Sequence, residues 1–162
     1  MKRFISGLAA LGALLVMAVP AQASGAGAVS LTQTFHNATQ TFVPPDPNAV
    51  QPCTGVLGTL TLTYNGVAHA TFLTSGVGAG TGWFTFTATG RFTFAGADGV
   101  NFAGQFTAWD GQSFNLQNFA ATGILHVNGT GSDGSSLKFH DVMHISVSAS
   151  GIALSFDKPT CG

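Results

Sequence analysis

The chain has 162 residues and a mass of 16.5 kDa, the size of one domain, and 45% of its residues are hydrophobic. Only 7% are Asp, Glu, Lys or Arg, against roughly 25% in an average globular protein. This excludes a solvating charged tail and a basic nucleic-acid-binding surface. With 22 Gly, 14 Phe and no Glu, the composition disfavours helices and favours β-strands joined by frequent turns.

The first 23 residues have the features of a secretory signal peptide. Lys2 and Arg3 precede an apolar stretch from about Phe4 to Val19, and Ala21-Gln22-Ala23 form a cleavage signature. Because this stretch is shorter than the ~20 residues of a membrane-spanning helix, we favour a signal peptide over a retained anchor. We therefore expect a secreted, extracellular protein in which residues 24–162 form a single domain without a stable transmembrane segment.

Two cysteines, Cys53 and Cys161, lie in this expected mature part. An even number of cysteines in an exported chain is typical of a disulfide. Neither cysteine has a second Cys or a His at the spacing of metal ligands. We predict one disulfide between them that fixes the C-terminus, and we expect no metal site and no cofactor.

From Ala28 onward the apolar residues recur with period two, as in half-buried strands. The breaks between runs contain Asn-Gly or Asp-Gly, pairs that favour hairpin turns. Turns are expected at Asn65-Gly66, Asp98-Gly99, Asp110-Gly111, Ser132-Asp133-Gly134 and Ser150-Gly151. The predicted strands are one within 28–43, followed by Gly58–Tyr64, Val67–Leu73, Trp83–Ala95, Val100–Trp109, Phe114–Val127, Leu137–Val147 and Ile152–Asp157.

The apolar residues of these strands define one inner face. In the strand from Trp83, the even positions carry Phe84, Phe86, Phe92 and Phe94, and Phe102 and Phe106 continue the set. About eight sequential antiparallel strands of this kind form either an up-and-down barrel or a β-sandwich. We favour the all-β barrel, because Gly90 and Gly104 lie within strands where a strongly coiled sheet needs them.

The segment Phe42–Pro52 contains four prolines and cannot be a central strand. It is predicted to be a loop that ends next to Cys53. Two interpretations remain open for it: a lid over one mouth of the barrel, or a passive connection fixed by the disulfide.

His140 and His144 are the most suggestive pair of polar residues. In a strand they lie about 13 Å apart, too far to bind one metal ion, although His69 or His126 from a neighbouring strand could approach one of them. No G-x-S-x-G motif is present to support a hydrolase. Asp98, Asp110 and Asp133 each precede Gly and are interpreted as turn residues. The two histidines are thus either outward-facing polar positions or isolated acid–base groups.

The outer face is rich in Thr, with Thr59, Thr61, Thr63, Thr85, Thr87, Thr89 and Thr93 in the polar phase. Such a face could form hydroxyl ladders that bind a polysaccharide, or simply reflect the preference of Thr for exposed strands. Trp83 and Trp109 fall in the same phase. An exposed Trp can stack on a sugar or contact a partner, or can cap the end of a strand.

The segments Gly129–Ser135, His140 to His144 and Phe156–Gly162 carry a resemblance. Through them the chain resembles small secreted bacterial β-proteins to which no activity is assigned, and the resemblance covers most of the mature part. In architecture alone, the chain is similar to calycin-type and allene-oxide-cyclase-type barrels. The resemblance implies a β-barrel and no particular function.

Three functions follow from these patterns. The first is a non-catalytic secreted binding protein, with a small apolar ligand inside the barrel near Phe86 and Phe102, or a partner or cell-surface glycan on the Trp and Thr face. The second is a cofactor-free isomerase or hydrolase that uses His140 or His144 with an Asp. The third is a barrel inserted in a membrane, with Phe facing lipid. Because few charges oppose self-association, a homo-oligomer is also expected.

Overall fold

The computed structural model describes residues 27–162, so the expected signal peptide lies outside the described residues. Within 27–162 there is no helix, and eight antiparallel strands form a single sheet. The strands are β1 (Ala28–Phe42), β2 (Gly58–Leu73), β3 (Gly82–Gly96), β4 (Asn101–Phe114), β5 (Phe119–Gly131), β6 (Ser136–Ser148), β7 (Gly151–Asp157) and β8 (Thr160–Cys161).

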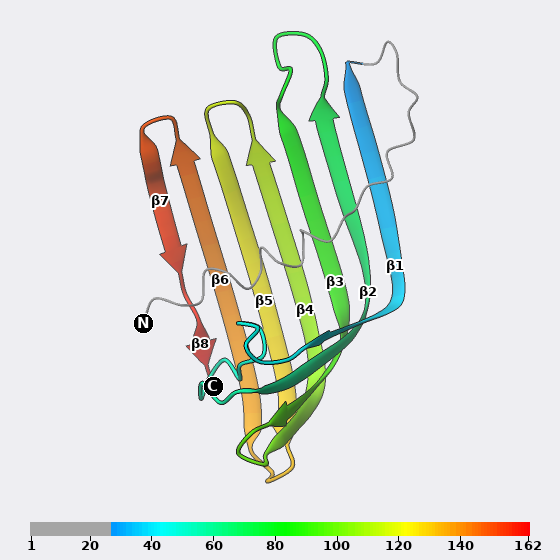
Figure 1. Cartoon of the computed structure of the whole chain (residues 1–162), viewed down its shortest axis with the longest axis vertical. Coiled ribbons are helices and arrows are strands. Elements are labelled where there is room, and N and C mark those ends of the chain that lie inside the picture. Colours follow the sequence, from blue (N-terminus) through cyan, green and yellow to red (C-terminus); the bar gives the residue numbers. More distant parts are fainter. Residues whose placement is uncertain (1–26) are drawn as a thin grey trace.

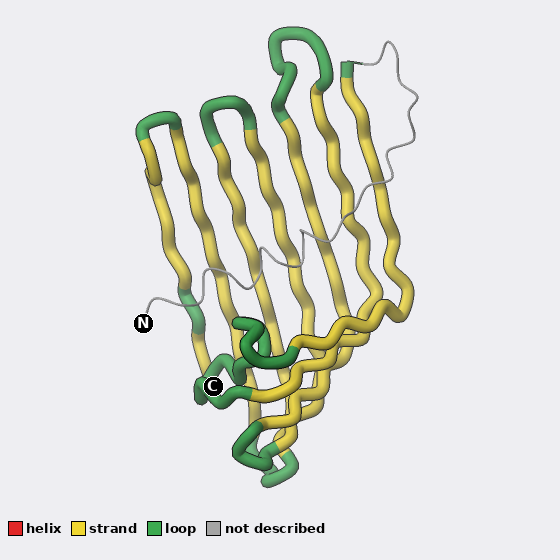
Figure 2. The backbone as a smooth tube through the Cα atoms, in the orientation of Figure 1, coloured by secondary structure: helices red, strands yellow, loops and turns green. Residues whose placement is uncertain are grey.

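The strands follow one another across the sheet in chain order, from β1 to β7, and β8 pairs with β6 beyond the end of β7. Figure 1 shows the long strands side by side, with the lower ends of β1 to β4 curling across the sheet. Figure 2 shows the loops that join these strands at both ends, and the connection between β1 and β2 is the longest of them. The prediction of an all-β, antiparallel, up-and-down fold of eight strands is confirmed, and among the described residues hydrogen bonds do not close the sheet into a ring.

Alternation along each strand separates a concave face from an outer face. The concave face carries the core, which combines aromatic residues of β2 to β6 with small Ala side chains. Tyr64 and Phe86 pack edge to face with ring centroids 6.3 Å apart, and both also contact Phe35. The apolar phase predicted for β3 is therefore the buried phase, with Phe86, Phe92 and Phe94 buried.

Two predicted turns are wrong. Asn65-Gly66 lies in the middle of β2, and Asp110-Gly111 lies within β4, so the predicted strands on either side of Asn65-Gly66 are one strand of 16 residues. The alternation of apolar residues explains why no turn forms at Asn65-Gly66. A two-residue turn would place positions 64 and 67 on the same face of the sheet, whereas a continuous strand places them on opposite faces. Even positions remain apolar from Leu62 through Ala68 to Phe72, as a continuous strand requires. The total of eight strands is nevertheless reached, because the short β8 was not expected.

The other Asp-Gly turns are present. Asp98 Oδ1 accepts a hydrogen bond from the Val100 N–H at 3.0 Å, and Asp133 Oδ1 accepts one from the Ser135 N–H at 2.9 Å. The following Gly99 and Gly134 have φ values of 87° and 83°, which disfavour any residue with a side chain. Here the sequence pair and the backbone requirement agree.

Gly90 and Gly104 lie where the sheet is most closely packed. A Cβ atom at Gly90 would collide with the carbonyl oxygen of Thr63, and one at Gly104 would collide with that of Asn128. Both glycines therefore permit neighbouring backbones to approach, as expected for a strongly coiled sheet.

β1 contains a bulge where it curves. Its pairing with β2 shifts register between Phe35 and Ala38. Asn37, inside the bulge, has a φ of 49°, and its N–H donates a hydrogen bond to Asn65 Oδ1 at 3.0 Å. This bond fixes the extra residue to β2, the only strand to which β1 pairs in the described part.

Residues 43–57, which we call the strap, connect β1 to β2 and contain the predicted proline-rich loop except Phe42, which is the last residue of β1. The strap carries Cys53, which forms the predicted disulfide with Cys161 of β8. Since β8 lies on β6, this bond joins the β1–β2 connection to the opposite side of the sheet. Within 27–162, no helix has the length and apolar character needed to cross a membrane.

Candidate functional site

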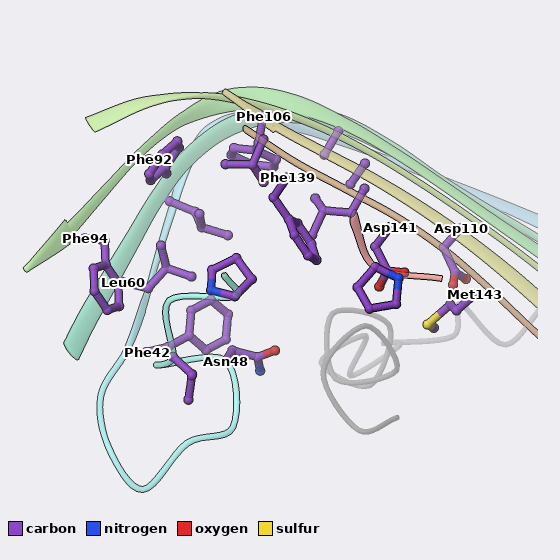
Figure 3. A pocket seen from close by; sticks show the side chains of 18 of the residues that line it. Phe42, Asn48, Leu60, Phe92, Phe94, Phe106, Asp110, Phe139, Asp141 and Met143 are labelled. Atoms are coloured by element: carbon purple, nitrogen blue, oxygen red, sulfur yellow. The ribbon is translucent and has the colours of Figure 1, made fainter. Parts of the chain in front are cut away.

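A cavity of about 220 Å³ lies between the concave face of the sheet and the strap. Figure 3 shows the curved strands above it and the strap below, with Phe92, Phe94 and Leu60 at one end and Asp110, Asp141 and Met143 at the other. An engineered apolar cavity of about 150 Å³ binds benzene. The cavity is thus large enough for one aromatic ring with a short substituent, and the core aromatic residues that line it are Phe42, Tyr64, Phe84, Phe86, Phe92, Phe94, Phe106 and Phe139.

The side chains around the cavity are well buried but not sealed. Phe92 is 4% exposed and Phe139 is 8% exposed, and in the described part no large side chain falls below 2%. The concave face is therefore not packed solid.

The strap that covers the cavity is fixed by its own hydrogen bonds. The buried Gln51 side chain accepts hydrogen bonds from the N–H groups of Cys53 and Thr54, both at 2.6 Å. Asp46 Oδ1 accepts the N–H of Asn48 at 2.8 Å, and Ala49 is completely buried. With the disulfide, these bonds give the cavity a preformed wall, which reduces the entropy lost on binding.

One end of the cavity is acidic. Asp141 of β6 and Asp157 of β7 both line it and lie close enough to share a proton. Burial, together with the hydrogen bond and negative charge of Asp157, raises the pKa of Asp141 to about 6. Oδ1 of Asp141 is buried and has no hydrogen-bond partner among the described residues. The carboxyl pair can therefore accept a hydrogen bond from a donor inside the cavity.

Asp110 is the third acidic residue, and its interpretation as a turn residue is wrong. It lies within β4 on the concave face, lines the cavity and is only 6% exposed. The Gln112 amide donates a hydrogen bond to its Oδ1 at 2.9 Å, while burial raises its pKa. Its even position, in phase with Phe106 and Ala108, is the signal that could have identified it.

The two phenylalanines predicted to contact a ligand differ in position. Phe86 is buried and lines the cavity. Phe102 packs against the core but does not line it. The two therefore form a natural pair of test and control positions.

The predicted Trp and Thr face is the outer face. Trp83 and Trp109 are 44% and 38% exposed, and Thr85, Thr87, Thr89 and Thr93 are exposed around them. Trp109 lies across Gly111, where an added Cβ would be 2.5 Å from the indole. In the pairing of β3 with β4, Trp109 is opposite Thr87, four residues or roughly 13 Å from Trp83.

His140 and His144 also lie on the outer face, opposite to the phase of Asp141. His140 stacks on His126 of β5, with ring centroids 4.2 Å apart and planes inclined by 8°. Nδ1 of His144 hydrogen-bonds the Thr122 hydroxyl at 2.7 Å, and its ring stacks on Phe156. Between residues 27 and 162, no group of three His, Cys, Asp or Glu could hold a metal ion. The structure thus brings His126 to His140, but brings neither predicted histidine to the carboxylates of the cavity.

Sequence reasoning missed the pairing of Asp141 with Asp157. The two residues are 16 positions apart, and they meet because β7 pairs with β6 so that Asp157 is opposite Met143. That pairing contains a register shift between Ser146 and Val147, which no local sequence pattern indicates.

Comparisons of the chain with protein-family models, with curated proteins and with solved structures found no match. The resemblance to small secreted bacterial β-proteins therefore stays a prediction, and the assignment of a function rests on the site itself.

Proposed function

We propose that the protein is a secreted, non-catalytic binding protein that holds one small apolar molecule in the concave cavity. The observation that carries this proposal is the 220 Å³ cavity with phenylalanine walls beneath a covalently fixed strap. Ligand pockets typically combine an apolar lining with a few convergent polar groups, and this cavity has that composition. The disulfide is consistent with the oxidising environment of a secreted protein.

The acidic end of the cavity narrows the class of ligand. Asp110, Asp141 and Asp157 would repel a carboxylate and attract an amine, and the unpartnered Oδ1 of Asp141 can accept a hydrogen bond. The ligand that fits best is an aromatic ring or short alkyl chain with an amine or other hydrogen-bond donor at one end. No histidine lines the cavity, which favours binding over acid–base catalysis.

The test is isothermal titration with 2-phenylethylamine, with 3-phenylpropionate as the compound of opposite charge. We expect one amine to bind per chain and the carboxylate to bind at least tenfold more weakly. Phe86→Trp should fill part of the cavity and weaken amine binding at least tenfold. Phe102→Trp makes the same change outside the cavity lining and should alter the affinity less than twofold.

Two results would overturn the proposal. The first is the absence of amine binding at millimolar concentration to the folded protein, with the disulfide verified by mass spectrometry. The second is an equal loss of affinity in both tryptophan variants, which would place the ligand elsewhere. Equal binding of amine and carboxylate would overturn only the role of the acidic end.

A further inference from the structure

The outer face contains a second, quite different depression. It is an open polar groove of about 890 Å³ that crosses the strands from Asn37 in the β1 bulge to the C-terminal residues of β8. We call it the outer groove. Its polar side chains point away from the concave face, and the residues that line both depressions are the apolar Phe106, Val127 and Phe139.

Strand register places the polar side chains of the outer groove in two rows that run across the sheet. The first row has one residue on each of five neighbouring strands, β2 to β6. Its members are opposite one another in consecutive pairings: Thr63, Arg91, Gln105, Asn128 and Lys138. This row has a cation on β3, a cation on β6 and an amide on each strand between them.

The second row lies two residues away along the strands. It supplies hydroxyl groups and the stacked imidazole pair, in the order Asn65, Thr89, Thr107, His126, His140 and Thr160. The two rows together give the groove a continuous floor of groups that donate and accept hydrogen bonds.

The charges of the two depressions are segregated. Of the three Lys and Arg side chains in 27–162, Arg91 and Lys138 line the outer groove, and none of the six Asp does. The remaining cation, Lys158, lies over the Phe156 ring at 5.1 Å instead. Although the described residues carry more Asp than Lys and Arg, the outer groove is locally cationic.

The spacing of the cations sets the length of the ligand. Arg91 and Lys138 are separated by three interstrand spacings of ~4.8 Å each, or roughly 14 Å between strands. Side chains of a strand stand roughly perpendicular to the sheet, which keeps the two cationic ends as far apart as their strands. A ligand that contacts both cations in this arrangement is extended and carries at least two anionic groups.

The uncharged side chains of the outer groove indicate which class of extended anion fits it. Amide and hydroxyl groups match the hydroxyls of a sugar, since both donate and accept. Single-stranded nucleic acids are held mainly by bases stacked on exposed aromatic residues and by many cations. Phe106 and Phe139, the two phenylalanines that line the outer groove, are buried from the other side, and two cations are few for a polyphosphate.

We propose that the outer groove binds an acidic oligosaccharide along the two rows, with Arg91 and Lys138 each contacting one anionic group. Gln105 and Asn128 contact the sugar hydroxyls between these two groups. This site is independent of the cavity, so the failure of either proposal leaves the other standing.

The experiment is isothermal titration of the intact, disulfide-bonded protein with a hexamer of galacturonic acid at low ionic strength. Maltohexaose serves as the neutral sugar, and dT₁₂ serves as the nucleic acid. We expect the acidic hexamer to bind at least tenfold more tightly than either control. Lys138→Gln should weaken binding about tenfold, as expected for loss of a hydrogen bond to a charged group. Lys158→Gln removes the same charge outside the groove and should change affinity less than twofold.

Arg91→Gln tests the other end of the first row and should also weaken binding about tenfold. Because Arg91 and Lys138 are exposed, both variants should fold, and circular dichroism with thermal unfolding verifies this. The proposal is overturned by the absence of binding of the acidic hexamer at millimolar concentration. It is equally overturned if Lys158→Gln weakens binding as much as Lys138→Gln, or if maltohexaose or dT₁₂ binds as tightly as the acidic hexamer.

Discussion

The concave and outer faces of the sheet are made from the same strands and have opposite chemistry. The concave face is built from phenylalanine and carries Asp110, Asp141 and Asp157 around a small covered cavity. The outer face is built from threonine and carries Arg91 and Lys138 in a wide open groove. Since every second residue faces the same side, a shift of one position separates these two environments.

The difference shows how a chain with few charges can present two distinct surfaces. With only 7% charged residues, each charge contributes noticeably to the field of its own face. Substitutions at even positions of β3 should therefore affect the core and cavity, while those at odd positions affect the outer groove alone.

The largest effect should come from removing the disulfide. The double variant Cys53→Ser with Cys161→Ser should lower the free energy of unfolding by about 4 kcal/mol, because the bond closes a long loop in the unfolded chain. Urea unfolding at 10 °C measures this. The strap lines the cavity and contributes no residue to the outer groove, which Cys161 lines only at the β8 end. Binding of 2-phenylethylamine should therefore be lost, while the folded protein retains saccharide binding through the two cations. Loss of both, with the fold intact by circular dichroism, would contradict the separation of the faces.

A smaller effect is expected from neighbouring positions of β3. Phe92→Ala removes a ring that is 4% exposed and should cost about 3 kcal/mol in the free energy of unfolding. Thr93→Ala, one residue further on the outer face, should change it by less than about 0.5 kcal/mol. Chemical denaturation of both variants gives the comparison, and similar costs would mean that the outer face is also packed against something.

The smallest effect concerns Asp141. An acid with a raised pKa in the folded state binds its proton more tightly when folded, so Asp141 contributes stability that is present near pH 4 and is lost as pH rises through about 6. Asp141→Asn should therefore raise stability at pH 8 by on the order of 1 kcal/mol, after allowance for solvent screening, and should flatten the profile between pH 4 and 7.

Asp133→Asn is the control for this charge change. The Ser135 side chain and N–H lower the pKa of Asp133, so its contribution has the opposite sign: it is present at neutral pH and lost on acidification. Thermal unfolding from pH 2 to 8 compares the two variants, because the contribution of Asp133 is lost below its ordinary pKa of 3.8. A stabilising effect of Asp133→Asn at pH 8, or a destabilising one of Asp141→Asn, would contradict these assignments.

Much of the fold was predictable because the period-two pattern is strict. Local patterns predict the buried phase of Phe86, Phe92 and Phe94 and the turns at Asp98 and Asp133. The Cys53–Cys161 bond was predictable because the chain has only two cysteines. The errors at Asn65-Gly66 and Asp110-Gly111 arise because such pairs also occur inside strands, where the alternation of apolar residues continues in the same phase on both sides of the pair. Gly66 and Gly111 instead make room, respectively, for the Thr87 carbonyl and the Trp109 indole.

The candidate sites were harder to predict because they depend on register between strands. The stacking of His126 on His140 requires β5 and β6 to be aligned to the residue, and that alignment is set by the turn at 132–135. The approach of Asp157 to Asp141 depends on the register shift in the β6–β7 pairing. A sequence shows which face a residue takes, but not which residue lies opposite on the next strand.

The bulge in β1 has a consequence for association between molecules. Among the described residues, the outer edge of β1 is unpaired, and Ala28–Phe42 contains neither a charged residue nor a proline, the usual protection against edge-to-edge aggregation. The extra residue near Asn37 divides this edge into 28–35 and 38–42, which differ in register. A straight strand from another molecule can align with only one of these two segments. The bulge therefore shortens the continuous strand edge to which another strand could add.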